Sequence, residues 1–174
     1  MRIVMAFLAF AIFSLSATAQ AVKPAGCHVL EDLQGEWDWK TPPDQGFHRG
    51  TFSFRNEVNG KVVLVKVTWL LPQGKSASEE LFVIQSDQKD RAQHFDDRGA
   101  TSTCTIEVSD DQCKLKTTCS AAVPPGYEFI MQSKDEIRFV VNVSSTDPKE
   151  KLVPWITAQA RRKSSGDSQP ANPR

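Results

Sequence analysis

The sequence has no excess charge of either sign and no recognisable catalytic motif. Its 174 residues carry 21 basic and 21 acidic side chains, so it lacks the dense basic surface that binding to a phosphate backbone requires, and no nucleic-acid partner is expected. It also lacks a Gly-x-Ser-x-Gly elbow, a Walker-type phosphate loop and a His-Glu-x-x-His motif. We therefore do not expect an enzyme, and we expect neither a cofactor nor a metal ion.

The only long apolar run lies at the start of the chain. It covers residues 3–15, follows Arg2 and precedes Ala17, Ala19 and Ala21, which is the pattern of a secretory signal peptide over 1–21. A spanning helix needs about 20 apolar residues, so we expect no stable transmembrane segment after processing, with a retained anchor as the alternative. The sequence thus predicts a secreted or periplasmic protein.

Four cysteines, Cys27, Cys104, Cys113 and Cys119, suit two disulfides in an exported chain and allow three pairings. Residues 104–119 are typical of a hairpin around Asp110-Asp111, which favours Cys104–Cys119 across the strands and Cys27–Cys113 for the N-terminal segment. Lipid attachment at Cys27 is an alternative, although it would leave an odd thiol. The spacing does not resemble a zinc site with paired Cys-x-x-Cys knuckles.

Between Glu36 and Ala160 the chain shows about ten short strand-like segments separated by turn signals, with no convincing helix between them. We expect an all-β fold: a single antiparallel up-and-down β-barrel of about 8–10 strands over residues 35–162, in a monomeric protein. The segment 22–34 is expected to contain a short helical turn that could plug one end of the barrel. Residues 163–174 are poor in apolar side chains, which predicts a disordered tail.

The dipeptide Asn59-Gly60 is the strongest turn signal, because both positions tolerate a positive φ. A hairpin centred there places Phe54 opposite Val65 and Phe52 opposite Val67. These four side chains would form one apolar face.

Gly35-Glu36-Trp37 at the start of the first strand resembles the Gly-x-Trp opening of lipocalin-like (calycin-type) proteins. In that family the tryptophan closes the floor of the barrel, and a basic residue near the last strand packs over it. The resemblance implies the same closure here by Trp37 and Arg161, with Arg162 as the alternative partner.

A second resemblance is broader. The residues 59–62, 85–87 and 91–99 contain Asn-Gly-Lys, an Asp and Ala-Gln-His-Phe-Asp-Asp-Arg-Gly in an order similar to that of small bacterial extracytoplasmic lipocalin-like domains. That group includes haem-binding nitrobindin-like barrels, which use a histidine late in the chain as the iron ligand. No histidine follows His94, so haem ligation of that type is not expected here.

A barrel of this size can hold one small ligand. The predicted ligand-binding residues combine aromatic side chains with polar groups that could hydrogen-bond a ligand, with Gln132 as a further polar candidate: His94, Trp69, Tyr127, Phe129 and Arg138. Trp39 and Trp155 could also line a cavity, yet aromatic side chains in a barrel are more often core, and His94 could be an internally satisfied histidine. Glu79-Glu80 and Asp96-Asp97 are interpreted as solvated charges, because adjacent residues on a strand point to opposite faces.

Together these patterns predict an exported lipocalin-like barrel that binds a small, hydrophobic ligand in its interior. The alternative is a non-catalytic protein-interaction or inhibitor-like barrel that acts through its rim loops, 41–48, 72–78 and 121–126.

Overall fold

The computed structural model describes residues 27–46, 48–88, 90–120, 124–146 and 152–164. The predicted signal peptide and residues 165–174 of the predicted tail lie outside these ranges. Within them, no helix is both long and apolar enough to cross a membrane. Lys163 still pairs with the barrel, because its backbone N–H donates to the carbonyl of Glu36 over 2.8 Å.

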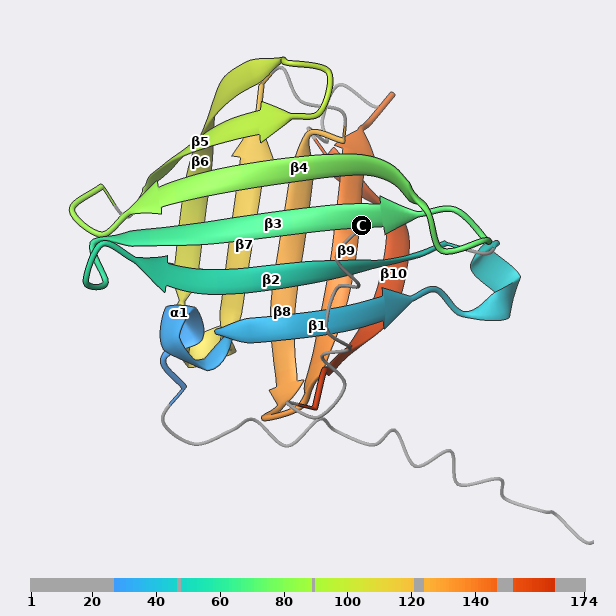
Figure 1. Cartoon of the computed structure of the whole chain (residues 1–174), viewed down its shortest axis with the longest axis horizontal. Helices are drawn as coiled ribbons and strands as arrows, with labels where there is room; N and C mark the ends of the chain where they lie inside the picture. Colours follow the sequence, from blue (N-terminus) through green and yellow to red (C-terminus); the bar gives the residue numbers. More distant parts are fainter. Residues whose placement is uncertain (1–26, 47, 89, 121–123, 147–151, 165–174) are drawn as a thin grey trace, which may run out of the picture.

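Ten antiparallel strands form a closed barrel in which each strand pairs with its neighbours in sequence and the first strand pairs with the last (Figure 1). This confirms the all-β up-and-down barrel. The elements are the short helix α1 (Val29–Asp32), the strands β1 (Gly35–Lys40), β2 (Arg49–Glu57), β3 (Val62–Leu70), β4 (Ser76–Gln85), β5 (Arg91–Asp96), β6 (Thr101–Ser109), β7 (Lys114–Cys119), β8 (Gly126–Ser133), β9 (Glu136–Ser144) and β10 (Leu152–Arg162), and the 3-10 turns Pro43–Gln45 and Asp110–Gln112.

The first hairpin has the predicted register. Phe54 lies opposite Val65 and Phe52 opposite Val67. The ladder ends one pair earlier than a two-residue turn requires, because Val58 and Asn59 both adopt a positive φ, of 51° and 56°. The connection is therefore a four-residue turn, over residues 58–61.

Aromatic rings pack against one another across the middle of the barrel. They come from alternate positions of the strands, which point inward, and the centroids of Phe52 and Phe129 are 5.0 Å apart, with Phe139 5.1 Å from Phe129. The largest fully buried aromatic side chains are Trp37, Trp39, Phe52, Phe54, Phe82, Tyr127, Phe129 and Phe139. This cluster is the core of the fold.

The helix α1 lies at one end of the barrel, as the sequence predicts for the short N-terminal turn (Figure 1). The backbone N–H of Val29 donates to the carboxylate of Asp110 over 3.1 Å, and Val29 and Leu33 are fully buried. The indole N–H of Trp37 donates to the carbonyl of Leu33 over 2.9 Å. Side-chain contacts thus hold α1 over this end.

The basic residue that closes this end is Arg162, not Arg161. The guanidinium carbon of Arg162 lies 4.1 Å from the centre of the Trp37 ring, and the same guanidinium donates to the carbonyls of Gln34 and Asp32. Arg161 faces outward and pairs with Glu136 at 3.5 Å. Strand alternation decides between them, because Trp37 lies directly opposite Arg162 in the β1–β10 register, so the two side chains share the inner face.

Both predicted cysteine pairs are at disulfide distance. Cys104 and Cys119 lie opposite each other on β6 and β7 with Cα atoms 4.2 Å apart. Cys27 and Cys113 have Cα atoms 5.7 Å apart and join the segment before α1 to the β6–β7 connection. The second pair links residues that are 86 positions apart in the sequence.

Asp96 organises the turn between β5 and β6. Its carboxylate accepts hydrogen bonds from the backbone N–H groups of Ala100 and Arg98, over 2.8 and 3.0 Å, and from the Arg98 guanidinium. The Ala100 N–H and then the Arg98 side chain lower the pKa of Asp96, because they favour its charged form.

Candidate functional site

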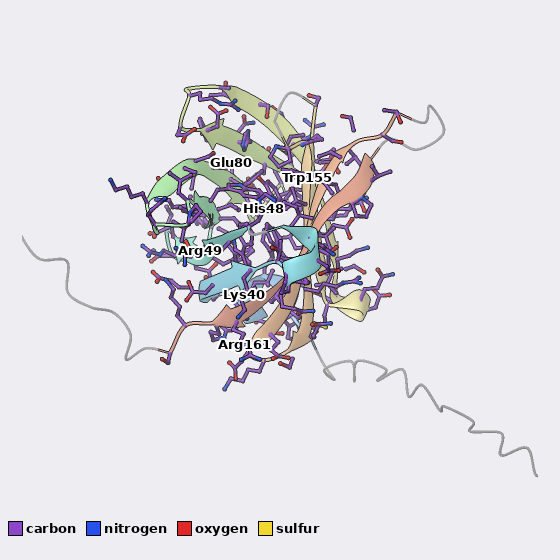
Figure 2. All side chains as sticks on the ribbon, turned by 90° about the vertical axis from the view of Figure 1, so that its right-hand side faces the viewer. Lys40, His48, Arg49, Glu80, Trp155 and Arg161 are labelled. Carbon is purple, nitrogen blue, oxygen red and sulfur yellow. A yellow bond between two sulfur atoms is a disulfide. The ribbon has the colours of Figure 1, made fainter. Side chains whose placement is uncertain are left out.

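A pocket of about 290 Å³ opens at the end of the barrel opposite α1; we call it the mouth pocket. Figure 2 faces this end, and its labels place His48, Glu80 and Trp155 around the opening. The lining residues come from the mouth ends of β3, β4, β9 and β10 and from the segments before β2 and β8: His48, Trp69, Ser78, Glu80, Pro124, Val143 and Trp155. The pocket is close to the lower end of the size range of small-molecule sites.

Three aromatic rings form one wall of the mouth pocket. The rings of Trp69 and Trp155 are stacked, with centroids 6.3 Å apart and planes at 29°. The His48 ring lies 5.8 Å from Trp155 and 6.5 Å from Trp69. Trp155 is 54% exposed, although it is a large aromatic side chain.

A bulge in β10 explains the position of Trp155. Pro154 pairs with Asn142 and Ile156 pairs with Val141, so Trp155 has no partner in the ladder. Such an extra residue redirects a side chain away from regular alternation. Pro154 also has no N–H to donate, which suits an interrupted ladder.

The Trp69 ring packs against Trp39 on the side that faces the core. Their rings meet edge to face with centroids 4.9 Å apart. Gly50 makes this packing possible, because a Cβ atom there would lie 2.7 Å from the Trp39 ring. Trp39 is only 2% exposed and is therefore core, whereas Trp69 is half-buried and reaches the pocket.

Glu80 contributes a carboxylate to the pocket and is only 3% exposed. It points inward because it shares the inner face of β4 with Phe82 and Ile84. The Tyr127 hydroxyl donates to Oε1 of Glu80 over 2.5 Å, and Nε2 of His94 lies 3.0 Å from Oε2. The interpretation of Glu80 as a solvated charge is thus wrong, because two partners from distant strands satisfy it inside the barrel.

The network extends from His94 to Ser102, whose Oγ lies 3.3 Å from Nδ1 of the imidazole. Nε2–H of the imidazole donates to Glu80, and the Ser102 hydroxyl can either donate to Nδ1 or accept from it. Ser102 does not line the mouth pocket, so the network orients Glu80 there and does not present Ser102 as a nucleophile.

Burial raises the pKa of Tyr127 well above its ordinary value, and the negative charge of Glu80 and the hydrogen bond to it act in the same direction. Hydrogen bonding from Trp69 acts in the opposite direction and is the smallest contribution. Tyr127 therefore stays protonated and remains a donor to Glu80.

The structure brings together only some of the predicted ligand-binding residues. Trp69 lines the mouth pocket, and Tyr127 and His94 lie behind Glu80. Phe129 is fully buried among other rings. The prediction that Arg138 binds a ligand inside the barrel is wrong. Its side chain is exposed on the outer face of β9, because strand alternation turns Ile137 and Phe139 inward.

Sequence reasoning missed Glu80 and His48 as pocket residues. For Glu80 a signal was present, since the alternation of Phe82 and Ile84, continued back by two residues, places residue 80 on the inner face. For His48 no local pattern indicates the contact with Trp155, which lies on the last strand. Among the described residues, no group of three or more His, Cys, Asp or Glu side chains is placed to hold a metal ion.

The fold and site define a closed ten-strand β-barrel with an aromatic mouth and a buried carboxylate at its base. No family model matches the chain, and no curated protein matches it. A solved structure that matches is a de novo designed fluorescence-activating β-barrel, 14% identical, over 78% of this chain and 97% of that chain, with a TM-score of 0.33. Membership of a lipocalin-like family stays a prediction.

Proposed function

We propose that this protein is an exported lipocalin-like barrel that binds a small hydrophobic ligand in the mouth pocket. The observation that carries the proposal is the half-exposed Trp155, stacked on Trp69 over a cavity of about 290 Å³. A large aromatic side chain in such a position leaves apolar surface in water that a ligand can cover. Export is supported by the two cysteine pairs, because disulfides persist in oxidising compartments.

The mouth is favoured over the centre of the barrel as the place of the ligand. Phe52, Phe129 and Phe139 occupy the centre and contact one another directly. A ligand there would have to displace core side chains, and truncating such a side chain costs roughly 3–5 kcal/mol. Covering the exposed half of Trp155, in contrast, contributes up to about 3 kcal/mol at 25 cal/mol per Å².

The test is a titration with N-phenylnaphthylamine, a neutral apolar dye whose emission rises when it leaves water. We expect a saturable rise with the wild-type protein. Trp155→Ala should abolish it by removing the wall, and Ser78→Phe should abolish it by filling the pocket. Phe95→Ala is the matched control, since Phe95 is an aromatic side chain that is 40% exposed elsewhere on the surface.

A flat titration of the wild-type protein would refute the proposal. Binding that survives Ser78→Phe and Trp155→Ala but disappears in Phe95→Ala would place the ligand outside the barrel mouth.

A further inference from the structure

We propose that the ligand of the mouth pocket is an organic cation, a protonated amine on a small apolar or aromatic body. This inference rests on the function proposed above and narrows its ligand class. The feature that points to it is the combination of three aromatic rings, from His48, Trp69 and Trp155, with the carboxylate of Glu80 in the same pocket.

The carboxylate has unused acceptor capacity. An ionised carboxylate offers about four lone-pair positions, and Glu80 receives one contact on each oxygen, from Tyr127 and from His94. Glu80 also lines the pocket, so its remaining lone pairs are available to a ligand.

A purely apolar ligand would bind in this pocket more weakly than an apolar ligand that also carries a cation. It would cover the carboxylate without using the lone pairs that Tyr127 and His94 leave open and without balancing the charge. An ammonium group supplies both the hydrogen bond and the opposite charge. Such charge-assisted hydrogen bonds are stronger than neutral ones.

The charge of Glu80 acts on Arg98, whose own hydrogen bonds go to another carboxylate. Nε2 of His94 occupies one position on Oε2 of Glu80, and its Nδ1 contacts the Ser102 hydroxyl. Arg98 is bound through two nitrogens to Asp96, at 3.0 and 2.8 Å, and points into the solvent-exposed turn.

The aromatic wall favours the same ligand. The face of an indole attracts a cation within about 6 Å of the ring centroid, and tryptophan is the strongest of the aromatic side chains in this respect. Trp69 and Trp155 lie with their planes at 29°, beside the carboxylate and not remote from it. An amine in the mouth pocket would contact this aromatic surface and Glu80, because all three residues line it.

The experiment compares three probes that share a phenyl group: phenethylamine, phenethyl alcohol and phenylpropionate, titrated calorimetrically into the folded protein at neutral pH. We expect the amine to bind at least about tenfold more tightly than the alcohol, which corresponds to 1.4 kcal/mol. The carboxylate probe should bind most weakly, because it meets Glu80 as a like charge.

Two variants locate the effect. Glu80→Gln should reduce the advantage of the amine over the alcohol to less than about threefold, because it removes the charge and keeps the size. Since Glu80 is buried, a second variant is needed: Trp155→Leu keeps an apolar wall at an exposed position and should weaken the amine about fivefold more than the alcohol.

The outcomes separate this inference from the proposed function. If N-phenylnaphthylamine binds in a Trp155-dependent way but the amine and the alcohol bind equally, the cation inference is overturned and the hydrophobic site stands. If the amine is preferred and neither variant reduces the preference, the inference is also overturned. If neither the dye nor any probe binds, both proposals fail.

Discussion

Replacing Tyr127 with phenylalanine removes a single hydroxyl from the buried network and leaves the ring in place. The ring of Tyr127 stacks on Phe139 with centroids 5.6 Å apart and planes at 9°, and phenylalanine can keep this contact. The hydroxyl is the donor to Oε1 of Glu80, a carboxylate that is 3% exposed. A hydrogen bond to a charged group contributes about 1.5–3 kcal/mol, so we expect Tyr127→Phe to lower the free energy of unfolding by about 2 kcal/mol near neutral pH.

Tyr127 also makes the free energy of unfolding fall at alkaline pH. Because the pKa of Tyr127 is raised in the folded protein, its contribution is fully present below the unfolded pKa of about 10 and is lost as the pH rises toward the folded pKa. Above about pH 10 the unfolded chain releases the phenolic proton and the folded chain keeps it. The stability advantage of the wild type over Tyr127→Phe should therefore shrink by about 1.4 kcal/mol per pH unit.

The assay is unusually direct because the sequence contains one tyrosine. Phenolate absorbance in the near ultraviolet reports this residue alone, while tryptophan emission reports unfolding. We expect phenolate absorbance to develop only together with unfolding. Phenolate that forms near pH 10 while the tryptophan emission of the folded barrel is unchanged would refute the buried donor and the network built on it.

Three further predictions concern the closed end, the cysteine pairs and acid stability. Arg162→Ala should lower the free energy of unfolding, measured in urea, by about 0.5–2 kcal/mol, because it removes the stacking on Trp37. Arg161→Ala removes only an exposed ion pair and should cost about 0–1 kcal/mol. Equal losses would contradict the closure by Arg162. Replacing the two cysteines of one pair by alanine should lower the free energy of unfolding by about 3 kcal/mol for Cys104–Cys119 and by about 4.6 kcal/mol for Cys27–Cys113. In the chain-entropy model the loss grows with the sequence separation, which is 15 for the first pair and 86 for the second. The reverse order in urea unfolding would contradict the model here. Asp96→Asn should make the free energy of unfolding less dependent on pH in the acid range. The pKa of Asp96 is lowered in the folded protein, so its contribution to stability is present above about pH 4 and is lost as the pH falls through the folded pKa. An unchanged acid dependence would count against the turn contacts.

Local patterns were sufficient for most of the architecture. The alternation of apolar residues located the strands, and the turn at Asn59-Gly60 set the register that pairs Phe52 with Val67. The cross-strand Cys104–Cys119 pair followed from the same kind of reasoning, because it joins neighbouring strands. These features depend on residues close in the chain, where periodicity is informative.

The site was harder to predict from the sequence, because its contacts join residues that are far apart in the chain. Glu80 is satisfied by His94, which is 14 residues away, and by Tyr127, which is 47 residues away. Alternation along β4 places Glu80 on the inner face, but it does not indicate which partners would satisfy the carboxylate there. Trp155 reaches the pocket through a bulge, which shifts the side-chain alternation that strand prediction relies on.

The sequence by itself predicted an up-and-down barrel of about 8–10 strands with a helical turn at one end, because pleat, turn chemistry and strand order are read from neighbouring residues; the structure has ten strands. Of the three possible cysteine pairings, the sequence favoured the one that the structure shows. Only the tertiary structure decided that Arg162 covers Trp37, that the centre is packed with aromatic rings and that Glu80 lies at the base of the mouth pocket. Each of these depends on the register in which distant strands meet when the barrel closes. A shift of one residue in that register would exchange the inner and outer faces of a strand.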